Sequence, residues 1–376
     1  MPMFSASDLR WMDASLILAR RGLGQVWPNP SVGSVLVYEN RIIGRGFTQP
    51  SGRPHAEAMA LAQAGDAAKG ATAYISLEPC AHHGKTPPCV EGLIRAEVAR
   101  VVAPMRDPDP RVSGRGFARL EEAGIKVDTG CRVAEALELN RGFLMRHEIG
   151  RPMLTLKLAT SMDGKIATPS GESRWITASP ARRLAHLLRA EHDAILIGAG
   201  TARADDPMLD VRDLGMSRRS PIRIVADGGL SLPLTGQLAR TAKDVPLWLL
   251  HRRGVDAGRR KVWQDIGAEL IEVDADETGA LDMGAAFRLL ADRGLTRVFC
   301  EGGGRLAATL LKAGLVDELI QAVAGKVLGA DATPSIGPLG LDRLDDCAKF
   351  SLAGLQHAGP DLIARWVNDA TDGQTG

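Results

Sequence analysis

The chain has 376 residues, with 46 Lys and Arg against 45 Asp and Glu, and a formal net charge of +1. This length exceeds what one ordinary hydrophobic core needs, so we expect two domains. Hydrophobic residues at 45% and charged residues at 24% are typical of a globular protein and exclude a disordered or fibrous one. The balanced charge and the 4% aromatic content argue against a nucleic-acid-binding protein, which needs a basic excess and stacking platforms.

The N-terminal apolar stretch predicts an amphipathic helix. Leu9, Met12, Leu16 and Ala19 recur at helical spacing, and charged residues interrupt the stretch, which argues against a signal peptide. No apolar run approaches the length that spans a membrane. The five cysteines are odd in number and unevenly spaced, so they do not indicate a disulfide framework. We therefore expect a cytoplasmic protein with reduced thiols.

Strand-like and helix-like segments alternate through the first 149 residues. Two short strands are expected around a turn at Glu39 and Asn40, within residues 31–46. Further strands are predicted at 71–79, 99–105 and 125–130, and helices at 55–64, 90–98, 118–124 and 133–148. Such alternation predicts a mostly parallel sheet covered on both faces.

A second α/β series follows a predicted boundary at 150–152. Its expected strands are 153–161, 193–200, 221–227, 245–251, 268–275 and 296–303. Helices are expected to begin at Ser179-Pro180, a good start signal, and after Gly304. The polar tail at 369–376 is predicted to be disordered.

Three potential metal ligands lie in the first series. His55 opens a predicted helix, Cys80 ends a predicted strand, and Cys89 follows a Pro/Gly/His-rich loop. One imidazole and two thiolates suit Zn²⁺, which catalytic sites hold with three protein ligands and an open position for water. Glu57 can accept the proton of that water and pass it to a leaving amine. This H-x-E, with P-C and a second Cys, is the signature of zinc nucleobase deaminases.

A structural zinc site is the alternative. Eight residues separate Cys80 from Cys89, unlike the C-x-x-C spacing of the signature. A structural site closes with a fourth ligand, which His82 or His83 could supply. Because Glu57 has no role in a closed structural site, we favour the catalytic interpretation. The remaining thiols, Cys131, Cys300 and Cys347, are expected to be buried small hydrophobes.

Two glycine-rich turns mark the second half of the chain, at Gly198 to Thr201 and at Gly302 to Gly304. Such turns let backbone N–H groups approach an anion at a helix N-terminus. Neither matches G-x-G-x-x-G, because Arg203 stands where a third glycine belongs and Arg305-Leu306-Ala307 follow the second turn. From the residues alone, this half is an α/β domain suited to phosphate, and tight strand-to-helix packing explains either turn equally well.

Longer motifs extend along nearly the whole chain, up to the tail. They are PNPSVG at 28–33, HAE at 55–57, EPCAHHGKTPPC at 78–89, DPDPRVSGRG at 107–116, LKLATSMDGKIA at 156–167, GESRWIT at 171–177 and ADDP at 204–207. Together they resemble the bifunctional riboflavin-biosynthesis deaminase/reductase family. The long spacer between the two cysteines, odd for a cytidine deaminase, is what this family carries.

The resemblance implies an α/β protein with a three-layer cytidine-deaminase-like domain at 1–149 and a dihydrofolate-reductase-like domain at 150–368. It implies a zinc hydrolase that deaminates 2,5-diamino-6-(5-phosphoribosylamino)pyrimidin-4(3H)-one. An NADP-dependent oxidoreductase would then use NADPH to reduce the ribosyl group to ribityl, giving 5-amino-6-(5-phosphoribitylamino)uracil. The partner would be this small phosphorylated pyrimidine, with no nucleic acid and no membrane, and we expect a homo-oligomer.

The resemblance also assigns site residues. It places the zinc ligands on His55, Cys80 and Cys89, and the catalytic proton shuttle on Glu57. Its substrate-binding positions fall on Asn29, His82, Lys85, Ser173, Arg189, Leu209, Arg212 and Glu301. Its cofactor-binding positions fall on Ala159, Trp175, Thr201, Asp205, Gly228, Gly303, Gly304, Arg305, Leu306, Ala307, Ala308 and Thr309.

Several reductase positions keep a structural alternative. Arg189 and Arg212 could clamp the ribose phosphate in forked geometry, although a helix-surface ion pair would also explain Arg189. Trp175 could be a core residue or a wall of the nicotinamide site. Asp205 and Glu301 are candidate proton donors, with solvated loop acids as the alternative. A preference for NADPH needs a basic group at the 2′-phosphate, and the sequence does not choose among the arginines.

Two other functions stay open at this point. An RNA or free-nucleoside deaminase, whose second half only binds, is disfavoured by the near-zero charge and the few aromatic residues. Lys85, in the loop between the cysteines, instead suits a ribose phosphate. A non-enzymatic nucleotide-sensing module with a structural zinc is disfavoured by Glu57 beside the ligands.

Overall fold

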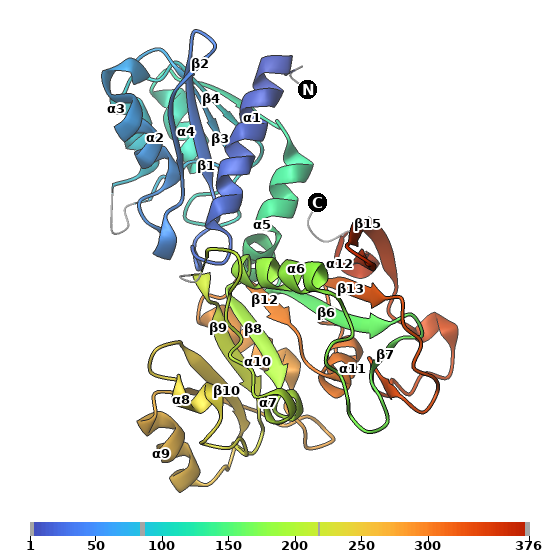
Figure 1. Cartoon of the computed structure of the whole chain (residues 1–376). Coiled ribbons are helices and arrows are strands. Elements are labelled where there is room, and N and C mark those ends of the chain that lie inside the picture. Colours follow the sequence, from blue (N-terminus) through green and yellow to red (C-terminus); the bar gives the residue numbers. More distant parts are fainter. Residues whose placement is uncertain (1–3, 83–86, 217–218, 373–376) are drawn as a thin grey trace. The chain divides into compact units, whose positions relative to one another are not determined.

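The structure is a computed structural model that describes residues 4–82, 87–216 and 219–372. The chain divides into two compact units, residues 1–149 and 150–376 (Figure 1). In the described ranges, no helix is both long and apolar enough to cross a membrane.

Unit 1 is built on a five-stranded sheet of order β2-β1-β3-β4-β5. The hairpin β1–β2 turns at Glu39 and Asn40, both with positive φ, as the sequence predicts. Strand β3 pairs antiparallel with β1 and parallel with β4, which pairs parallel with β5. The strands are β1 (Gly33–Tyr38), β2 (Arg41–Phe47), β3 (Thr72–Ile75), β4 (Arg100–Ala103) and β5 (Lys126–Thr129).

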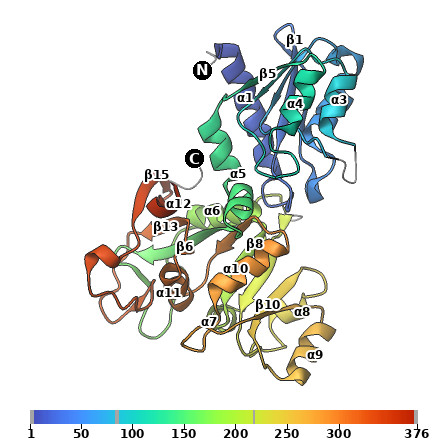
Figure 2. The ribbon, with the colours of Figure 1, turned by 180° about the vertical axis from the view of Figure 1, so that it is seen from behind.

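Helices cover both faces of this sheet. One apolar cluster joins α2, α3 and α4 to one face, and a second joins α1 to the other face, with α5 contributing to both (Figures 1 and 2). The three-layer arrangement predicted from the sequence is confirmed. The helices are α1 (Ala6–Ala19), α2 (Ala56–Ala64), α3 (Cys89–Arg95), α4 (Arg115–Glu122) and α5 (Val133–Glu148), with short 3-10 turns η1 (Arg20–Gly22), η2 (Pro50–Gly52) and η3 (Gly65–Ala68).

Helix α1 shows how local signals and burial agree. Ser5 and Asp8 form a capping box, in which the Ser5 hydroxyl accepts from the Asp8 N–H and the Asp8 carboxylate accepts from the Ser5 N–H. Met12, Leu16 and Ala19 are buried against the sheet. The amphipathic helix predicted at the N-terminus is therefore confirmed.

Unit 2 is built on a nine-stranded sheet of order β11-β10-β9-β8-β12-β6-β13-β16-β15. From β11 to β13 neighbouring strands run parallel, and β16 and β15 continue the sheet antiparallel. The strands are β6 (Met153–Ser161), β8 (Ala194–Gly198), β9 (Ile222–Ala226), β10 (Leu247–Arg252), β11 (Glu269–Val273), β12 (Arg297–Cys300), β13 (Glu318–Ala324), β15 (Phe350–Ala358) and β16 (Asp361–Asn368), with a separate pair β7 (Lys165–Ala167) and β14 (Thr333–Pro334).

The helices of unit 2 follow the strands of the parallel part, which confirms the α/β fold class. Residues of α7, α8 and α9 share an apolar cluster with β8, β9 and β10. The helices are α6 (Ser179–Ala190), α7 (Ala199–Asp205), α8 (Gln237–Arg240), α9 (Ala257–Asp265), α10 (Met283–Asp292), α11 (Gly304–Lys312) and α12 (Asp369–Asp372), with a 3-10 turn η5 (Leu344–Asp346).

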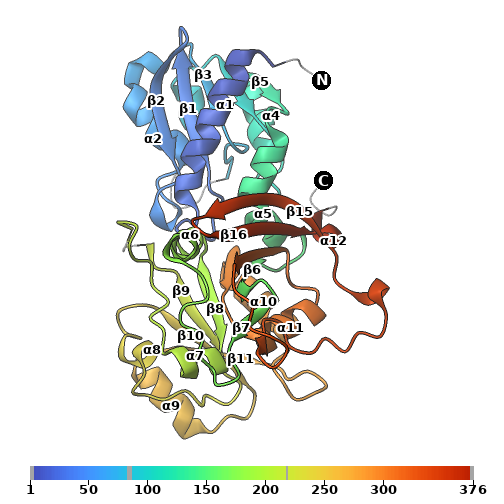
Figure 3. The same ribbon diagram turned by 45° about the vertical axis from the view of Figure 1, so that its right-hand side comes forward.

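Three features at the C-terminal end differ from or extend the sequence prediction. The long antiparallel hairpin of β15 and β16, which the sequence analysis did not find, lies at one edge of the sheet (Figure 3). Residues 369–372 form α12 rather than a disordered tail, because the Asn368 side chain accepts from the Ala370 N–H and caps the turn; residues 373–376 lie outside the described ranges. Cys347 is exposed rather than buried, because it lies in an exposed loop, whereas Cys131 and Cys300 are buried.

Candidate functional sites

The three predicted metal ligands converge in unit 1. His55 is the N-cap of α2, Cys80 lies in the loop after β3, and Cys89 is the first residue of α3. The His55 Nδ1 atom lies 3.5 Å from the Cys80 sulfur and 3.4 Å from the Cys89 sulfur. The ligand atoms all lie within 4.8 Å of one another, and no other cluster of this kind is found among the described residues.

This geometry fits a zinc ion. Zinc bonds of about 2.3 Å to sulfur and about 2.0 Å to nitrogen, opened at a tetrahedral angle, place nitrogen and sulfur about 3.5 Å apart. The Cys89 N–H also donates to the Cys80 sulfur at 3.3 Å, which supports a thiolate there. The side chain of Cys89 first, and then His55 and the Cys89 N–H, lower the pKa of Cys80 to about 4, although burial opposes this shift. His82, one proposed fourth ligand, is not in the cluster, and His83 lies outside the described residues, so the described part of the chain supplies three ligands.

Glu57 lies in the first turn of α2 and is 4% exposed. Burial raises the pKa of its carboxyl, and the nearby Cys80 raises it further. Glu57, His55 and Cys80 line one cavity of about 190 Å³. Glu57 and two of the three metal ligands, His55 and Cys80, therefore line the same cavity.

Two predicted substrate positions, Asn29 and His82, line this cavity as well. The Asn29 side chain donates to the Val26 carbonyl and packs on Gly52, where a Cβ would lie 1.9 Å from the Asn29 amide nitrogen. Gly52 has a φ of +81°, so only glycine suits this close approach. Lys85, the third predicted position, lies outside the described residues.

The structure adds an acidic and basic wall that the sequence analysis did not assign. Asp107, Asp109 and Arg111, from the DPDPR motif, line the cavity, as do Arg146 and His147 of α5. Burial raises the pKa of Asp107 to about 7, whereas the Arg111 guanidinium lowers the pKa of Asp109 to about 2. The only sequence signal for this wall was the motif itself.

Glu78, two residues before Cys80, anchors that wall. Its carboxylate is 3% exposed and accepts four backbone N–H groups, from Asp107 at 3.1 Å, Gly114 at 2.9 Å, Gly116 at 2.8 Å and Phe117 at 3.3 Å. A Cβ on Gly116 would lie 2.2 Å from the Pro79 carbonyl oxygen. One carboxylate thus fixes both the loop at 107–117 and the start of α4 beside the metal ligands.

In unit 2 the two glycine-rich turns meet. The Gly303 N–H donates to the Thr201 hydroxyl at 3.0 Å, which joins the start of α11 to α7. A Cβ on Gly302 would lie 2.6 Å from the end of the Leu306 side chain, so a larger residue there would have to displace Leu306. Because Thr201 takes the Gly303 N–H, the first-turn N–H groups from Gly304 onward are the ones that can face an anion.

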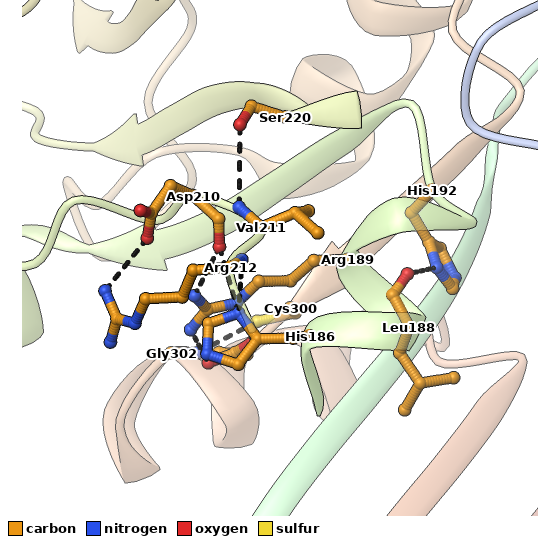
Figure 4. A network of polar contacts seen from close by, with 11 residues as sticks. His186, Leu188, Arg189, His192, Asp210, Val211, Arg212, Ser220, Cys300 and Gly302 are labelled. Atoms are coloured by element: carbon orange, nitrogen blue, oxygen red, sulfur yellow. Dashed lines mark hydrogen bonds and ion pairs between the residues drawn. The ribbon is translucent and has the colours of Figure 1, made fainter. Parts of the chain in front are cut away.

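Arg189 and Glu301, both predicted substrate positions, form a forked ion pair. The Arg189 Nε and Nη2 atoms donate to the two Glu301 oxygens at 2.7 and 2.8 Å, and Nη1 donates to the Asp210 carbonyl at 2.9 Å. Figure 4 shows Arg189 among His186, Asp210 and Arg212. The Arg189 fork therefore holds Glu301 and the backbone at Asp210, and the phosphate clamp expected for Arg189 stays a prediction.

Lys157 is a site residue that the sequence analysis missed. It lies on β6, where burial lowers the pKa of its amine and the Glu301 carboxylate opposes that shift. For Glu301, burial raises the pKa, but Arg189 and Lys157 outweigh it, and the net pKa is lowered. A lysine that interrupts the apolar strand MLTLKLATS was the available signal.

The other predicted reductase positions lie in different surroundings. Arg212 is exposed and pairs with Asp210 at 3.0 Å, whereas Leu209 is 3% exposed and packs in the core, so only its backbone can meet a ligand. Trp175 is 59% exposed under the Arg182 guanidinium, which makes it a surface residue rather than a core residue. Ala159 is on β6, Ser173 lies in the loop before α6, Asp205 ends α7, Gly228 follows β9, and residues 304–309 form the start of α11.

Family comparisons match each unit. Residues 5–105 match the cytidine and deoxycytidylate deaminase zinc-binding region, and residues 152–364 match the RibD C-terminal domain. The zinc assignment from geometry in unit 1 thus agrees with an independent comparison of sequence.

Whole-chain relatives give the same result. The riboflavin biosynthesis protein RibD of Escherichia coli K12 is 43% identical over 371 residues, covering 96% of this chain and 99% of that protein. The solved structure of Acinetobacter baumannii RibD, form 1, is 36% identical, with a TM-score of 0.86 over 96% of this chain and 99% of that chain. A diaminohydroxyphosphoribosylaminopyrimidine deaminase/5-amino-6-(5-phosphoribosylamino)uracil reductase from Thermotoga maritima is 30% identical, with a TM-score of 0.83 and coverage of 96% and 99%.

Proposed function

Because this chain belongs to the RibD family of riboflavin biosynthesis proteins, we propose that unit 1 carries its deamination site and unit 2 its reduction site. The chain is a bifunctional deaminase and reductase that uses zinc and NADPH. The proposed substrate of unit 1 is 2,5-diamino-6-(5-phosphoribosylamino)pyrimidin-4(3H)-one. Unit 2 then reduces the ribosyl group of the deaminated product to ribityl.

The convergence of His55, Cys80 and Cys89 beside Glu57 is the observation that carries the deaminase proposal. When bound, zinc supplies a water whose pKa is lowered to about 7. Glu57 takes a proton from the attacking water and delivers it to the amino group that leaves as ammonia. Its burial keeps this carboxyl group out of bulk solvent, so the proton stays between water, Glu57 and the leaving group.

Two candidates for binding the substrate, Asn29 and His82, line the same cavity. Asn29 is held rigidly against Gly52, which suits an amide that hydrogen-bonds the pyrimidine edge. His82 lines the cavity near the metal ligands, and Lys85 remains proposed for the ribose phosphate.

In unit 2, the N–H groups of the first turn of α11 suit the cofactor's pyrophosphate. NADPH supplies the hydride that reaches the sugar carbon, and a proton must reach the sugar oxygen as the ring opens. Lys157 and Glu301 are charged side chains that interact with each other in unit 2 and could exchange this proton. Arg189 holds Glu301 in place. We propose Lys157 and Glu301 as the groups that position the sugar and move this proton.

Two matched variants test the division of labour. The diaminopyrimidine phosphate is supplied with NADPH, and ammonia release and NADPH oxidation are followed separately. Glu57→Ala should abolish ammonia release, retain zinc, and still reduce the deaminated intermediate when that compound is supplied. Lys157→Met should release ammonia at the wild-type rate and lose NADPH oxidation.

The outcome that contradicts the proposal is equally specific. A folded, zinc-loaded Glu57→Ala protein that also fails to reduce the supplied intermediate would show that the two sites are not independent. A wild-type protein that oxidises NADPH without releasing ammonia would overturn the order of the two steps.

Location and assembly are further parts of the proposal. We propose a cytoplasmic protein that forms a homo-oligomer. Five free cysteines, with no disulfide joining them, support a reducing compartment. Light scattering on the purified chain measures the number of subunits, and a monomer at all concentrations would contradict the assembly.

A further inference from the structure

A hollow at the carboxyl edge of the unit 2 sheet connects α11 to the ends of β9 and β10. Its volume is about 300 Å³, and its lining includes Gly228 after β9, Arg252 at the end of β10, and Leu306 and Thr309 of α11. Three of these four, all except Arg252, are positions that the sequence analysis assigned to the cofactor. The hollow therefore extends from the proposed pyrophosphate site toward a residue that the sequence analysis did not single out.

The lining of this hollow is apolar on one side. Leu281 and Met283, together with Leu306, give it surface suited to a purine ring. A second hollow of about 410 Å³ adjoins it and shares Gly229, Arg252 and Gly279. Arg252 thus lines both hollows, the first with its apolar surface and the second with its charged residues.

Backbone carbonyls hold Arg252 across the end of β9. Its Nη1 atom donates to the Gly279 carbonyl at 2.9 Å and its Nε to the Gly228 carbonyl at 3.4 Å. A Cβ on Gly228 would lie 3.2 Å from the Arg252 Nε, so the glycine permits this close approach. A guanidinium has five N–H donors, and Arg252 therefore keeps donors for a ligand.

Two more arginines line the second hollow. Arg259 donates from Nη1 to the Gly229 carbonyl at 3.3 Å. Arg253 forms ion pairs with Glu272 and Asp274, at 3.4 and 3.1 Å. In the described ranges, by contrast, no ion pair joins Arg252 or Arg259 to a carboxylate.

One carboxylate, Asp256, also lines the second hollow. Its side chain accepts from the Arg259 N–H at 2.9 Å and caps α9, so it is committed to the helix. The second hollow therefore presents Arg252 and Arg259 as guanidinium groups not engaged by acids, next to a helix N-terminus that also favours negative charge.

We propose that Arg252 and Arg259 bind the 2′-phosphate of NADPH and so determine the preference of unit 2 for NADPH over NADH. This inference rests on the proposed reductase site, whose N-terminal turn of α11 shares a hollow with Arg252. Planar guanidinium forks match phosphate oxygens, and an arginine near the adenosine ribose is a general means of accepting a 2′-phosphate. NADH offers only a hydroxyl at that position and gains little from two cations.

Binding measurements on the full chain test this assignment. Wild type, Arg252→Met and Arg259→Met are titrated by calorimetry with adenosine 2′,5′-bisphosphate, AMP, NADPH and NADH. Each substitution should weaken adenosine 2′,5′-bisphosphate and NADPH by about tenfold or more, as expected for charge-assisted hydrogen bonds, and leave AMP and NADH unchanged. Unchanged affinity for AMP and NADH reports that unit 2 of each variant is folded.

Arg240→Met is the matched control. Arg240 is an exposed arginine at the end of α8 that lines neither hollow, so removing its charge should leave all four affinities unchanged. If both variants keep the wild-type ratio of NADPH to NADH affinity, or if Arg240→Met lowers NADPH affinity equally, the assignment is overturned. A wild-type chain that binds neither dinucleotide would instead contradict the proposed reductase site itself.

Discussion

Replacing Glu78 by glutamine tests whether one carboxylate organises the wall of the unit 1 cavity. The substitution keeps the shape of the side chain and changes one acceptor oxygen into an NH₂ donor. The Glu78 oxygens each accept two backbone N–H groups, one from Asp107 and Gly114, the other from Gly116 and Phe117. Whichever way the new amide is oriented, two of the four donors lose their acceptor.

The structure sets the size of the effect. A buried N–H group left without a partner costs about 1–3 kcal/mol, so two cost about 2–6 kcal/mol. Because unfolding a domain typically takes about 5–15 kcal/mol, this is a large fraction of the stability available to unit 1. The loss is local at first, since all four donors lie within residues 107–117.

Hydrogen exchange, followed by mass spectrometry on peptides covering residues 105–118, measures this local loss of stability. At the lower limit of about 2 kcal/mol, exchange of these amides should be about 30-fold faster than in wild type. Deamination should weaken, because Asp107, Asp109 and Arg111 lose their fixed position, while reduction of supplied intermediate should not change.

Glu91→Gln is the control for removing a charge. Glu91 pairs with Arg119 at 3.1 Å at the surface, and such exposed pairs contribute about 0–1 kcal/mol. If Glu78→Gln exchanges at the wild-type rate at 105–118, or if Glu91→Gln matches it, the reasoning is refuted.

Three further predictions concern the metal, the acid limb of stability and the thiols. Cys80→Ser should lose zinc, measured by elemental analysis, and lower the melting temperature of unit 1, because metal binding contributes to folding; full zinc content would contradict the ligand assignment. The folded pKa of Asp109, about 2, lies below its usual 3.8 because Arg111 donates to its carboxylate, so its contribution to stability is present above about pH 4 and is lost as the pH falls toward 2. Asp109→Asn should therefore be less stable than wild type in urea at pH 6, and most of this difference should disappear as the pH falls through 2. A difference of unchanged size at pH 2 would contradict this. Cys347 is exposed whereas burial raises the pKa of Cys131 to about 11 and of Cys300 to about 12, so a thiol reagent should label Cys347 first, and rapid labelling of either buried thiol would count against the fold.

Most strands in the parallel parts of both sheets could be predicted from the sequence because each is a short apolar run. Strand β13 was missed although it pairs parallel with β6, because its buried residues alternate with less buried ones and form no continuous apolar run. Strands β8, β9 and β10 are buried on both faces and read as continuous apolar segments. The hairpin β15–β16 could not be found in this way. Strand β15 is largely exposed, so its residues carry no apolar alternation, and only its pairing with β16 defines it.

The candidate sites also contain residues that the sequence could identify and residues that it could not. Zinc ligands and Glu57 act through side chains of rare chemistry, so residue type and spacing were enough to place them together. Glu78 acts on backbone N–H groups of residues 29–39 positions away, and nothing in the local sequence marks those partners. Arg189 shows the same limit, because its ion pair with Glu301 depends on a strand end more than 100 residues away, which the local sequence does not mark.

Helix N-termini serve both units, but through different parts of the chain. In unit 1, His55 caps α2 and Cys89 begins α3, so two ligands lie where the helix favours negative charge, and side-chain identity decides what binds. In unit 2, the first turn of α11 would recognise pyrophosphate through peptide N–H groups, which any residue supplies. Side-chain identity matters there only at the glycines that allow close approach and at a distant arginine such as Arg252, which meets the part of the cofactor that the helix does not reach. Substitutions that test unit 1 can therefore target its ligands one by one, whereas those that test the cofactor preference of unit 2 must target side chains near the ends of β9 and β10, such as Arg252.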